Sequence, residues 1–428
     1  MLTGREQETA FLENHYKRTG SQILVVYGQR GVGKTALLTS FTEKKQTLRY
    51  SAGNCSSREQ QYLWGRELRS RGKEIAEYPS WRELLECMTI QKGETTADKK
   101  VLIIENFQYL LKGDTLFLQE LIRFLKEKKE ALLVILTTYA SGWVENSMIS
   151  KVGNLAFSVS GFLKVKELPF SAMRKIFSDY TVQESISLYA ALGGLPGLWR
   201  LLYPQNSAEE NLIRLLLQRN SFLPELMIKW LSEESRETIL AMLADGRHGK
   251  LNDMYAHTGF SRAKISVYLK NLMELELVEK VLPGTYEICN AFVRFYFCFL
   301  FPHQTSERTE GSTFYEKYIR EEYNDFQLLT YRRICQEVLQ GRFRTVELWN
   351  SRQGKIYFLC REDTGRKIVV DYSGTVCYTS KDYDVLQASM KREHVTADSI
   401  LIFSENGYEK TLTERTVQIL VHSVDENS

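Results

Sequence analysis

The chain has 428 residues, 56 of them basic and 53 acidic, with a formal net charge of +3 and 43% hydrophobic residues. This length accommodates roughly two to four domains with their own cores and excludes a single small fold. The near balance of charge excludes a uniformly basic nucleic-acid-binding or membrane-surface protein, so any basic surface must be local. The seven cysteines form no CxxC pair and no apolar run is long enough to span a bilayer, so we expect a cytoplasmic protein without a membrane segment.

The first 170 residues alternate short apolar runs with amphipathic segments. The runs predict strands at 23–27, 48–52, 101–105, 132–137 and 163–168. Between them, segments such as 35–45, 58–71 and 115–129 have apolar residues three and four apart, which is typical of amphipathic helices. This alternation predicts an α/β domain with a parallel sheet and helices on both of its faces.

After residue 170 the pattern changes twice. Helical periodicity continues to about residue 230, and the next region predicts three helices followed by a hairpin that turns at Pro283 and Gly284. Beyond the aromatic run at 292–301, the pattern is mixed and predicts a helix followed by strands. We therefore expect four domains, with boundaries at 1–169, 170–230, 231–302 and 303–428.

The segment GQRGVGKT follows the first predicted strand and precedes the first predicted helix. Its spacing is that of a P-loop, in which glycines let backbone N–H groups curl around a phosphate. The helix N-terminus adds positive potential, Lys34 supplies a cation and Thr35 supplies a hydroxyl for Mg²⁺. We predict that ATP binds with Mg²⁺ through the loop residues Gly28, Gln29, Arg30, Gly31, Val32, Gly33, Lys34 and Thr35.

The second half of a P-loop site is an acid at the end of another strand. Glu105 ends the strand at 101–105 and is predicted to hold Mg²⁺ together with Thr35. Its neighbour Asn106 would orient the attacking water, and the hydroxyl of Thr137, at the end of a third strand, would sense the γ-phosphate. A competing interpretation is that Glu105 only caps the following turn.

The order of motifs along nearly the whole chain resembles the archaeal-type ATPases, P-loop proteins of the STAND branch related to AAA+. These motifs are GREQE at 4–8, the phosphate loop, VLIIENFQYL at 101–110, GGLP at 193–196 and NAFVRFYFCFLFPH at 290–303. The resemblance implies a P-loop ATPase core, a helical lid, a winged helix with an aromatic connector, and a C-terminal α+β domain resembling PD-(D/E)XK nucleases. These would be the four predicted domains, in that order.

The resemblance also implies binding roles outside the phosphate loop. Gly4, Arg5 and Glu8 correspond to the family's GRxxE segment, which lies near the adenine. Pro196 ends the lid motif that reports whether ATP or ADP is bound.

Two departures from the family pattern concern hydrolysis. Asn106 stands where the family usually has a glutamate, and an amide can orient a water but cannot take its proton. Phe162 stands where the family has an arginine, a residue that could stabilise charge in the transition state. We therefore expect hydrolysis to be slow or to depend on a partner.

The winged-helix region offers a basic face. Gly259 suits the turn of a helix-turn-helix, and the helix that follows carries Arg262, Lys264 and Lys270 without an acid. Residues 236–285 nevertheless balance seven basic against six acidic residues. DNA contact and internal packing are both open for this module.

The C-terminal domain lacks the full nuclease constellation that the family often carries. Asp371-Tyr372-Ser373 stands where an E-x-K triplet would be, so the lysine is missing, and Glu316 is the remaining helix acid. We expect no nuclease activity and a role in recognition or assembly.

The preferred interpretation is a nucleotide-gated switch, in which ATP bound between the sheet and the lid rearranges the winged helix and the C-terminal domain toward DNA or a protein partner. One alternative is a ring-forming ATP-driven motor, in which a second copy supplies an arginine. Another is a DNA-binding regulator in which the nucleotide is only structural.

Overall fold

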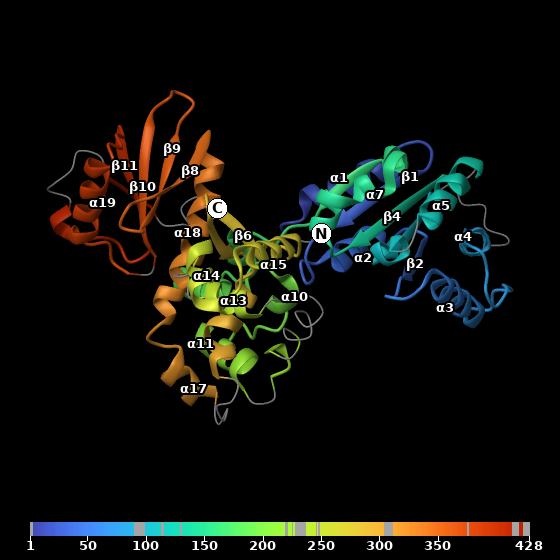
Figure 1. The fold of residues 1–428 in the computed structure, drawn as a ribbon, viewed down its shortest axis with the longest axis horizontal. Coiled ribbons are helices and arrows are strands. Elements are labelled where there is room, and N and C mark those ends of the chain that lie inside the picture. The colour runs from blue at the N-terminus through green and yellow to red at the C-terminus, as the bar shows by residue number, and fades with distance from the viewer. Residues whose placement is uncertain are drawn as a thin grey trace. The chain divides into compact units, whose positions relative to one another are not determined.

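The computed structural model describes residues 3–89, 99–112, 115–128, 131–218, 221–224, 226, 237–244, 246, 249–303, 311–374, 376–412 and 419–422. They belong to two compact units, Met1–Glu167 and Leu168–Ser428 (Figure 1). The predicted domain boundary at 230–231 lies outside the described residues.

The first unit contains a five-stranded parallel sheet, as the sequence predicted. Its strands are β1 (Gln22–Tyr27), β2 (Thr47–Ser51), β3 (Lys100–Glu105), β4 (Leu132–Thr138) and β5 (Gly161–Lys164). They lie in the order β2-β3-β4-β1-β5. Because β4 pairs in parallel with both β1 and β3, the carboxyl ends of these three strands meet at one edge of the sheet. In open parallel sheets, ligands bind at this edge.

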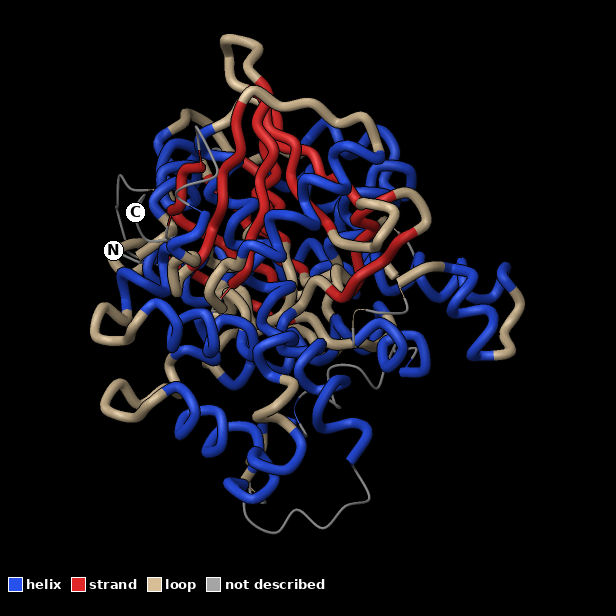
Figure 2. Tube along the Cα trace, turned by 90° about the vertical axis from the view of Figure 1, so that its left-hand side faces the viewer, coloured by secondary structure: helices blue, strands red, loops and turns tan. Residues whose placement is uncertain are grey.

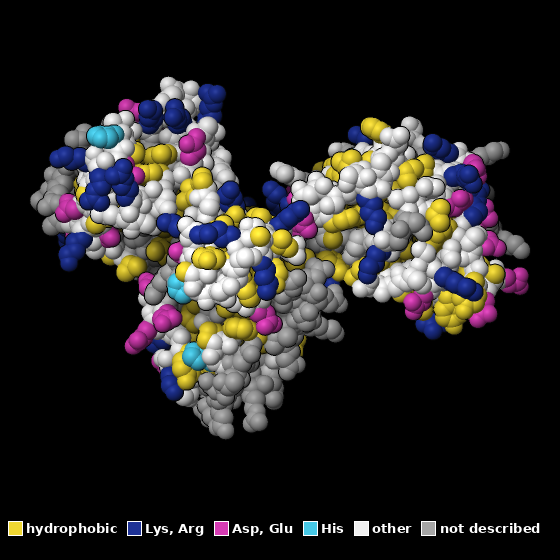
Figure 3. Space-filling model, viewed as in Figure 1, with side chains coloured by type: hydrophobic (Ala, Val, Ile, Leu, Met, Phe, Trp, Pro, Cys, Tyr) yellow, Lys and Arg dark blue, Asp and Glu magenta, His cyan; other side chains and the backbone are white. Residues whose placement is uncertain are grey.

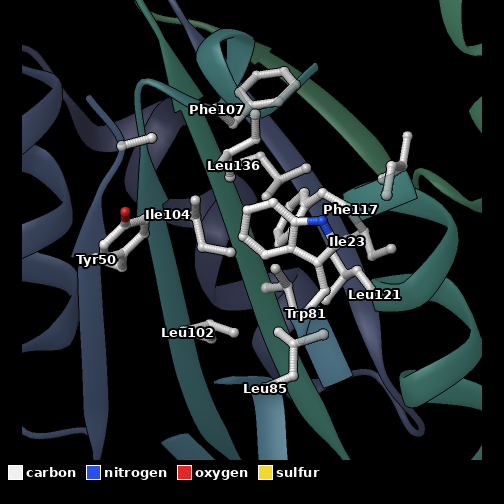
Figure 4. Packing of buried hydrophobic residues seen from close by; sticks show 14 of the residues in the cluster. Ile23, Tyr50, Trp81, Leu85, Leu102, Ile104, Phe107, Phe117, Leu121 and Leu136 are labelled. Carbon is white, nitrogen blue, oxygen red and sulfur yellow. The ribbon is translucent and has the colours of Figure 1, made fainter. Parts of the chain in front are cut away.

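Helices cover both faces of this sheet. They are α1 (Glu6–Lys17), α2 (Lys34–Thr42), α3 (Ser57–Ser70), α4 (Trp81–Thr89), α5 (Leu116–Glu127), α6 (Ser141–Trp143) and α7 (Ile149–Val152), with the short helices η1 (Phe107–Leu111), η2 (Val144–Met148) and η3 (Gly153–Ser158). On one face, Trp81 and Phe117 pack edge to face, 5.2 Å apart, over alternate strand residues such as Ile23 and Ile104 (Figure 4). On the other face, α1 packs against α2. Burial of both faces explains the continuous apolar runs in the sequence.

The last strand of this sheet differs from its predicted range of 163–168. β5 begins at Gly161, whose Cα lies so close to α1 that an added Cβ would be 2.9 Å from the ring of Phe11. It ends at Lys164, and the carbonyl of the next residue, Val165, lies against Gly28. These close contacts at both ends determine where the strand begins and ends. The hydrophobic pattern alone did not reveal these bounds.

The second unit begins with helices and a hairpin. The helical region comprises α8 (Phe170–Ile176), α9 (Val182–Leu192), α10 (Pro196–Trp199), α11 (Ala208–Leu212) and η4 (Ile213–Leu217). Next come α13 (Glu237–Ala244), α14 (Leu251–Thr258), α15 (Arg262–Glu274) and the antiparallel strands β6 (Val278–Leu282) and β7 (Thr285–Ile288). Three helices followed by a hairpin is the order that the sequence predicted.

The remainder of the second unit carries a mixed sheet. The aromatic segment forms α16 (Ala291–Phe295), η5 (Tyr296–Leu300) and η6 (Phe301–His303), and is followed by α17 (Gly311–Tyr318) and α18 (Tyr323–Arg342). Then come β8 (Thr345–Asn350), β9 (Ile356–Arg361), β10 (Lys367–Gly374), α19 (Ser380–Arg392), β11 (Ser399–Ser404), η7 (Lys410–Leu412) and β12 (Ile419–His422). The strand order is β12-β11-β10-β9-β8, antiparallel from β8 to β10 and parallel from β10 to β12. Figure 2 shows the strands in red and the helices in blue.

Helix α18 connects several parts of the second unit. It packs against α9 and against β10. Its Arg332 forms a largely buried ion pair with Glu287 of β7, and its Arg333 lies 2.7 Å from Glu279 of β6 and donates a hydrogen bond to the carbonyl of Ile288. The hairpin is therefore attached to the helix that also supports the C-terminal sheet.

Candidate functional site

Three glycines give the phosphate loop its shape. Gly28, Gly31 and Gly33 have φ values of 150°, 85° and 95°, a region that other residues adopt only with strain. At Gly28 the constraint is also steric, because an added Cβ would lie 2.1 Å from the carbonyl oxygen of Val165. The loop between β1 and α2 therefore requires glycine for reasons that are visible in the backbone.

Lys34 closes this loop. Its ammonium donates hydrogen bonds to the carbonyl oxygens of Gly28 at 2.5 Å and Gln29 at 2.8 Å. Lys34 and Thr35 are the first two residues of α2, so the positive end of the helix dipole lies at the same place. The Thr35 residue is exposed. A cation, a helix N-terminus and a hydroxyl together form an anion site suited to phosphate.

Arg5 contacts the phosphate loop directly. Its side chain is buried, and its guanidinium donates to the carbonyl oxygens of Val32 and Lys166, both at 2.7 Å, and to the Glu8 carboxylate at 2.7 Å. The neighbouring Gly4 has a φ of 75°, which turns the chain into α1. The role near the adenine that the resemblance implies for these residues stays a prediction; the structure adds a contact to the loop that the sequence did not indicate.

Glu105 and Asn106 lie at the predicted edge of the sheet. Glu105 is the last residue of β3, and its carboxylate is 3.8 Å from the guanidinium of Arg49 on β2. Asn106 adopts a left-handed backbone with φ 57°, a conformation in which asparagine is enriched, and its amide donates to the hydroxyl of Ser51 at 3.4 Å. Asn106 occupies the N-cap of η1. The Asn106 side chain makes no capping hydrogen bond there, and Mg²⁺ binding and capping both stay predictions for Glu105.

The end of β4 contacts the loop through a residue that the sequence analysis missed. Thr137 is buried and pairs in register with Val26 of β1. Two residues later, the Tyr139 ring stacks against the Arg30 guanidinium, 4.0 Å away, and its hydroxyl is 2.6 Å from that of Tyr109 in η1. The only signal in the sequence was a tyrosine shortly after each of two strands.

The residues at this edge fit a magnesium ion that arrives with a nucleotide. Within the described part of the chain, no group of three or more His, Cys, Asp or Glu side chains could hold a metal. Magnesium is commonly held by one or two protein oxygens together with substrate phosphates and water. The Thr35 hydroxyl and the Glu105 carboxylate offer oxygen atoms of this kind, and their role as ligands stays a prediction. Pro196, at the first position of α10, belongs to the second unit, and its sensing role stays a prediction.

A glycine loop between β1 and α2, with a carboxylate at the end of a strand two places away in a parallel sheet, defines a P-loop nucleoside triphosphatase domain. Residues 1–136 match the family described as the AAA ATPase domain. The match covers about the first third of the chain, the part in which the resemblance predicted an ATPase core.

Two relatives and one solved structure are similar to this chain. The chain is 24% identical over 403 residues to the uncharacterized protein MJECL04 of Methanocaldococcus jannaschii, covering 86% of each chain. It is 37% identical over 51 residues to the uncharacterized ATP-binding protein MJ0423 of the same organism, covering 12% of this chain and 86% of the relative. The Walker-type ATPase PABY2304 of Pyrococcus abyssi has a similar fold, with a TM-score of 0.50 and 15% identity over 69% of this chain and 96% of that one. In the described residues, no helix combines the length and apolarity needed to cross a membrane.

The α14–α15 surface carries the predicted basic residues. Ser261 caps α15, and the side chains of Arg262 and Lys264 lie over aromatic rings, 4.4 Å from Tyr255 and 3.9 Å from Phe260. Lys270 is exposed further along the helix. Lys and Arg side chains lie beside hydrophobic ones on this surface (Figure 3). The arrangement holds two of the cations in place beside aromatic rings on an exposed helix.

The two acids predicted in the C-terminal domain have separate surroundings. Asp371 is fully buried; its carboxylate accepts hydrogen bonds from Lys355 at 2.8 Å and from the Tyr378 hydroxyl at 2.7 Å. Burial raises the pKa of Asp371, although the Lys355 ammonium opposes the shift. Glu316 lies on α17, which packs against η4, and pairs with Arg320 at 2.6 Å. Because the Asp371 carboxylate is enclosed in this way, it supports the fold of the sheet and is not open to a metal.

Gly28→Ala is expected to lower the free energy of unfolding by about 2–3 kcal/mol, because the new Cβ would overlap the Val165 carbonyl. Gly20→Ala is the matched control, since Gly20 also has a positive φ of 73° but no neighbouring atom within 4 Å of the place that a Cβ would take. It should cost only about 1 kcal/mol. Urea unfolding of both variants measures the difference, and equal losses would contradict the steric argument.

Lys355→Met is expected to destabilise the protein more at pH 8 than at pH 5. The pKa of Asp371 lies above its ordinary value of 3.8 in the folded state, so its contribution to stability is greatest below pH 3.8 and declines as the pH rises. Removing the ammonium raises this pKa further and extends the decline, to a loss on the order of 3 kcal/mol at pH 8. Thermal unfolding across this pH range tests it, with Lys367→Met at an exposed position as control. A deficit that does not change with pH would contradict the assignment.

Proposed function

We propose that this chain is an ATP-binding switch that hydrolyses its nucleotide slowly unless a partner assists. The observation that carries the proposal is a complete phosphate loop, closed by Lys34, at the same sheet edge as Asn106, an amide where a base would be needed. The family of the N-terminal domain and the name of the ATP-binding relative MJ0423 support the nucleotide.

The roles of the residues follow from their positions. The loop N–H groups, Lys34 and the N-terminus of α2 would neutralise the phosphates. Thr35 and Glu105 would hold Mg²⁺, which when bound polarises the γ-phosphate. Asn106 would orient a water without accepting its proton, and Thr137 would sense the γ-phosphate. The proposed site thus has several groups that bind the phosphates, but no group that accepts the proton of the attacking water.

The output of the switch would come from the second unit. In this proposal the lid residue Pro196 responds to the nucleotide, and the helices α13 to α15 with their hairpin form a winged helix. Its residues Arg262, Lys264 and Lys270 are exposed on α15, whose one acid is Glu274 at its last position, and would contact DNA phosphates. The C-terminal sheet, attached through α18, would serve as a platform for a protein partner or a second copy.

Lys34→Ala is expected to weaken MgATP binding at least about 100-fold, which corresponds to roughly 2.7 kcal/mol. The variant loses both the ammonium that would meet the phosphates and the bonds that close the loop. Equilibrium binding of a fluorescent ATP analogue measures the change, and Lys17→Ala, at an exposed position on α1, is the control. Unchanged binding in Lys34→Ala would overturn the proposed site.

Asn106→Glu is expected to raise the ATP turnover rate by about 10²-fold, because a positioned general base contributes at least this much. Asn106→Gln is the matched control: it has the same length and the same backbone strain at φ 57°, but no carboxylate. Release of phosphate from MgATP is the measurement. Equal rates in the two variants would show that the missing base does not limit hydrolysis.

A further inference from the structure

The guanidinium of Arg5 joins three parts of the first unit that are far apart in the sequence. One of its nitrogens, Nη2, lies 2.7 Å from the carbonyl oxygen of Val32 and 2.7 Å from that of Lys166. The other, Nη1, lies 2.7 Å from Glu8 on the same helix. The Arg5 residue is only 5% exposed, so these contacts replace water as the partners of its charge.

Both carbonyls belong to segments that bear on nucleotide binding. Val32 precedes Gly33 and Lys34, and its own side chain is buried, which fixes this end of the loop. Lys166 comes two residues after the end of β5 and directly before Glu167, the last residue of the first unit. Arg5 therefore connects the end of the phosphate loop to the segment that leads into the second unit.

The start of the loop is connected to the same segment. The backbone N–H of Val165 donates to the carbonyl of Tyr27 at 2.7 Å, and the Val165 carbonyl lies against Gly28. Residues 165 and 166 thus contact both ends of the loop, one by direct backbone contact and the other through Arg5. A change in the shape of the loop must either move this segment or break a contact with it.

The chemistry of this bridge requires arginine. A planar guanidinium presents several donors in a fixed fork, whereas the ammonium of lysine is a compact point charge. A buried charge that loses one of its acceptors is strongly disfavoured, because its desolvation is no longer compensated. The carbonyls of Val32 and Lys166 are therefore held together as long as Arg5 is in place.

We propose that Arg5 is a positioning residue that couples the phosphate loop to residues 165–167, so that a bound triphosphate changes the conformation of the segment that enters the second unit. This inference rests on the proposed binding of nucleotide at the loop. It differs from a contact with the base, because Arg5 would act through the carbonyls of Val32 and Lys166 that it bridges.

The first test compares ligands with and without a base. Arg5→Lys is expected to weaken binding of MgATP and of magnesium tripolyphosphate by the same factor, about tenfold, since the loop and not the base is affected. Arg18→Lys, at an exposed position beyond α1, is the control. Weaker binding of MgATP with unchanged binding of tripolyphosphate would assign Arg5 to the base and overturn the proposal, as would unchanged binding of both.

The second test uses amide hydrogen exchange, which reports on each segment separately. If Arg5 only supported the fold, its substitution would not remove the protection by MgATP from one segment alone. In the native protein, MgATP is expected to protect residues 28–35 together with residues 166 and 167; in Arg5→Lys it should protect only 28–35. Retained protection of residues 166 and 167 in the variant overturns the coupling. Arg5→Gln, which places no charge at position 5, provides the same test if the lysine variant does not fold.

The same experiment distinguishes this inference from the proposed function. If the native protein binds no MgATP, the proposed function fails. The contacts of Arg5 are still tested without ligand, because Arg5→Lys should then raise exchange both in the loop and at residues 166 and 167. If exchange rises in neither segment, Arg5 does not hold them together.

Discussion

The close packing of the phosphate loop against residues 165 and 166 is the constraint on which the rest of the site depends. Gly28 must be glycine because the Val165 carbonyl occupies the space of a side chain, and Arg5 holds the other end of the loop through Val32. With both ends fixed, Lys34 and the N-terminus of α2 are directed at one point. The parallel sheet then brings the ends of β3 and β4 to the same edge.

Local parts of this arrangement were predictable from the sequence. The loop is encoded by spacing, and the strands by short apolar runs, so β1 to β4 were predicted within one or two residues. Contacts between distant residues were not predictable, because no local pattern specifies them. Arg5 contacts a carbonyl 161 positions away, and Asp371 contacts Lys355, the residue directly before the neighbouring strand β9. In the sequence, Ser373 stands where a lysine was expected. In the structure, the ammonium that contacts Asp371 belongs to Lys355.

The surroundings of Asn106 give a physical context for the expected weakness in hydrolysis. Its left-handed backbone favours asparagine over glutamate, so the residue that forms the turn directly after β3 is also one that cannot accept a proton. Glu105, the neighbouring carboxylate, faces Arg49 on the adjacent strand. In the second unit, α18 joins the hairpin to the C-terminal sheet, which favours an output made by several elements together. These are the observations behind the proposal of a switch.

The state of the bound nucleotide tests this account most directly. The protein is mixed with Mg²⁺ and radiolabelled ATP and separated from free nucleotide, and the bound ATP and ADP are then quantified over time. The account predicts about one bound nucleotide per chain that is still ATP after minutes, consistent with unassisted turnover on the order of 10⁻³ s⁻¹. Absence of bound nucleotide, or complete conversion to ADP within seconds, would contradict it.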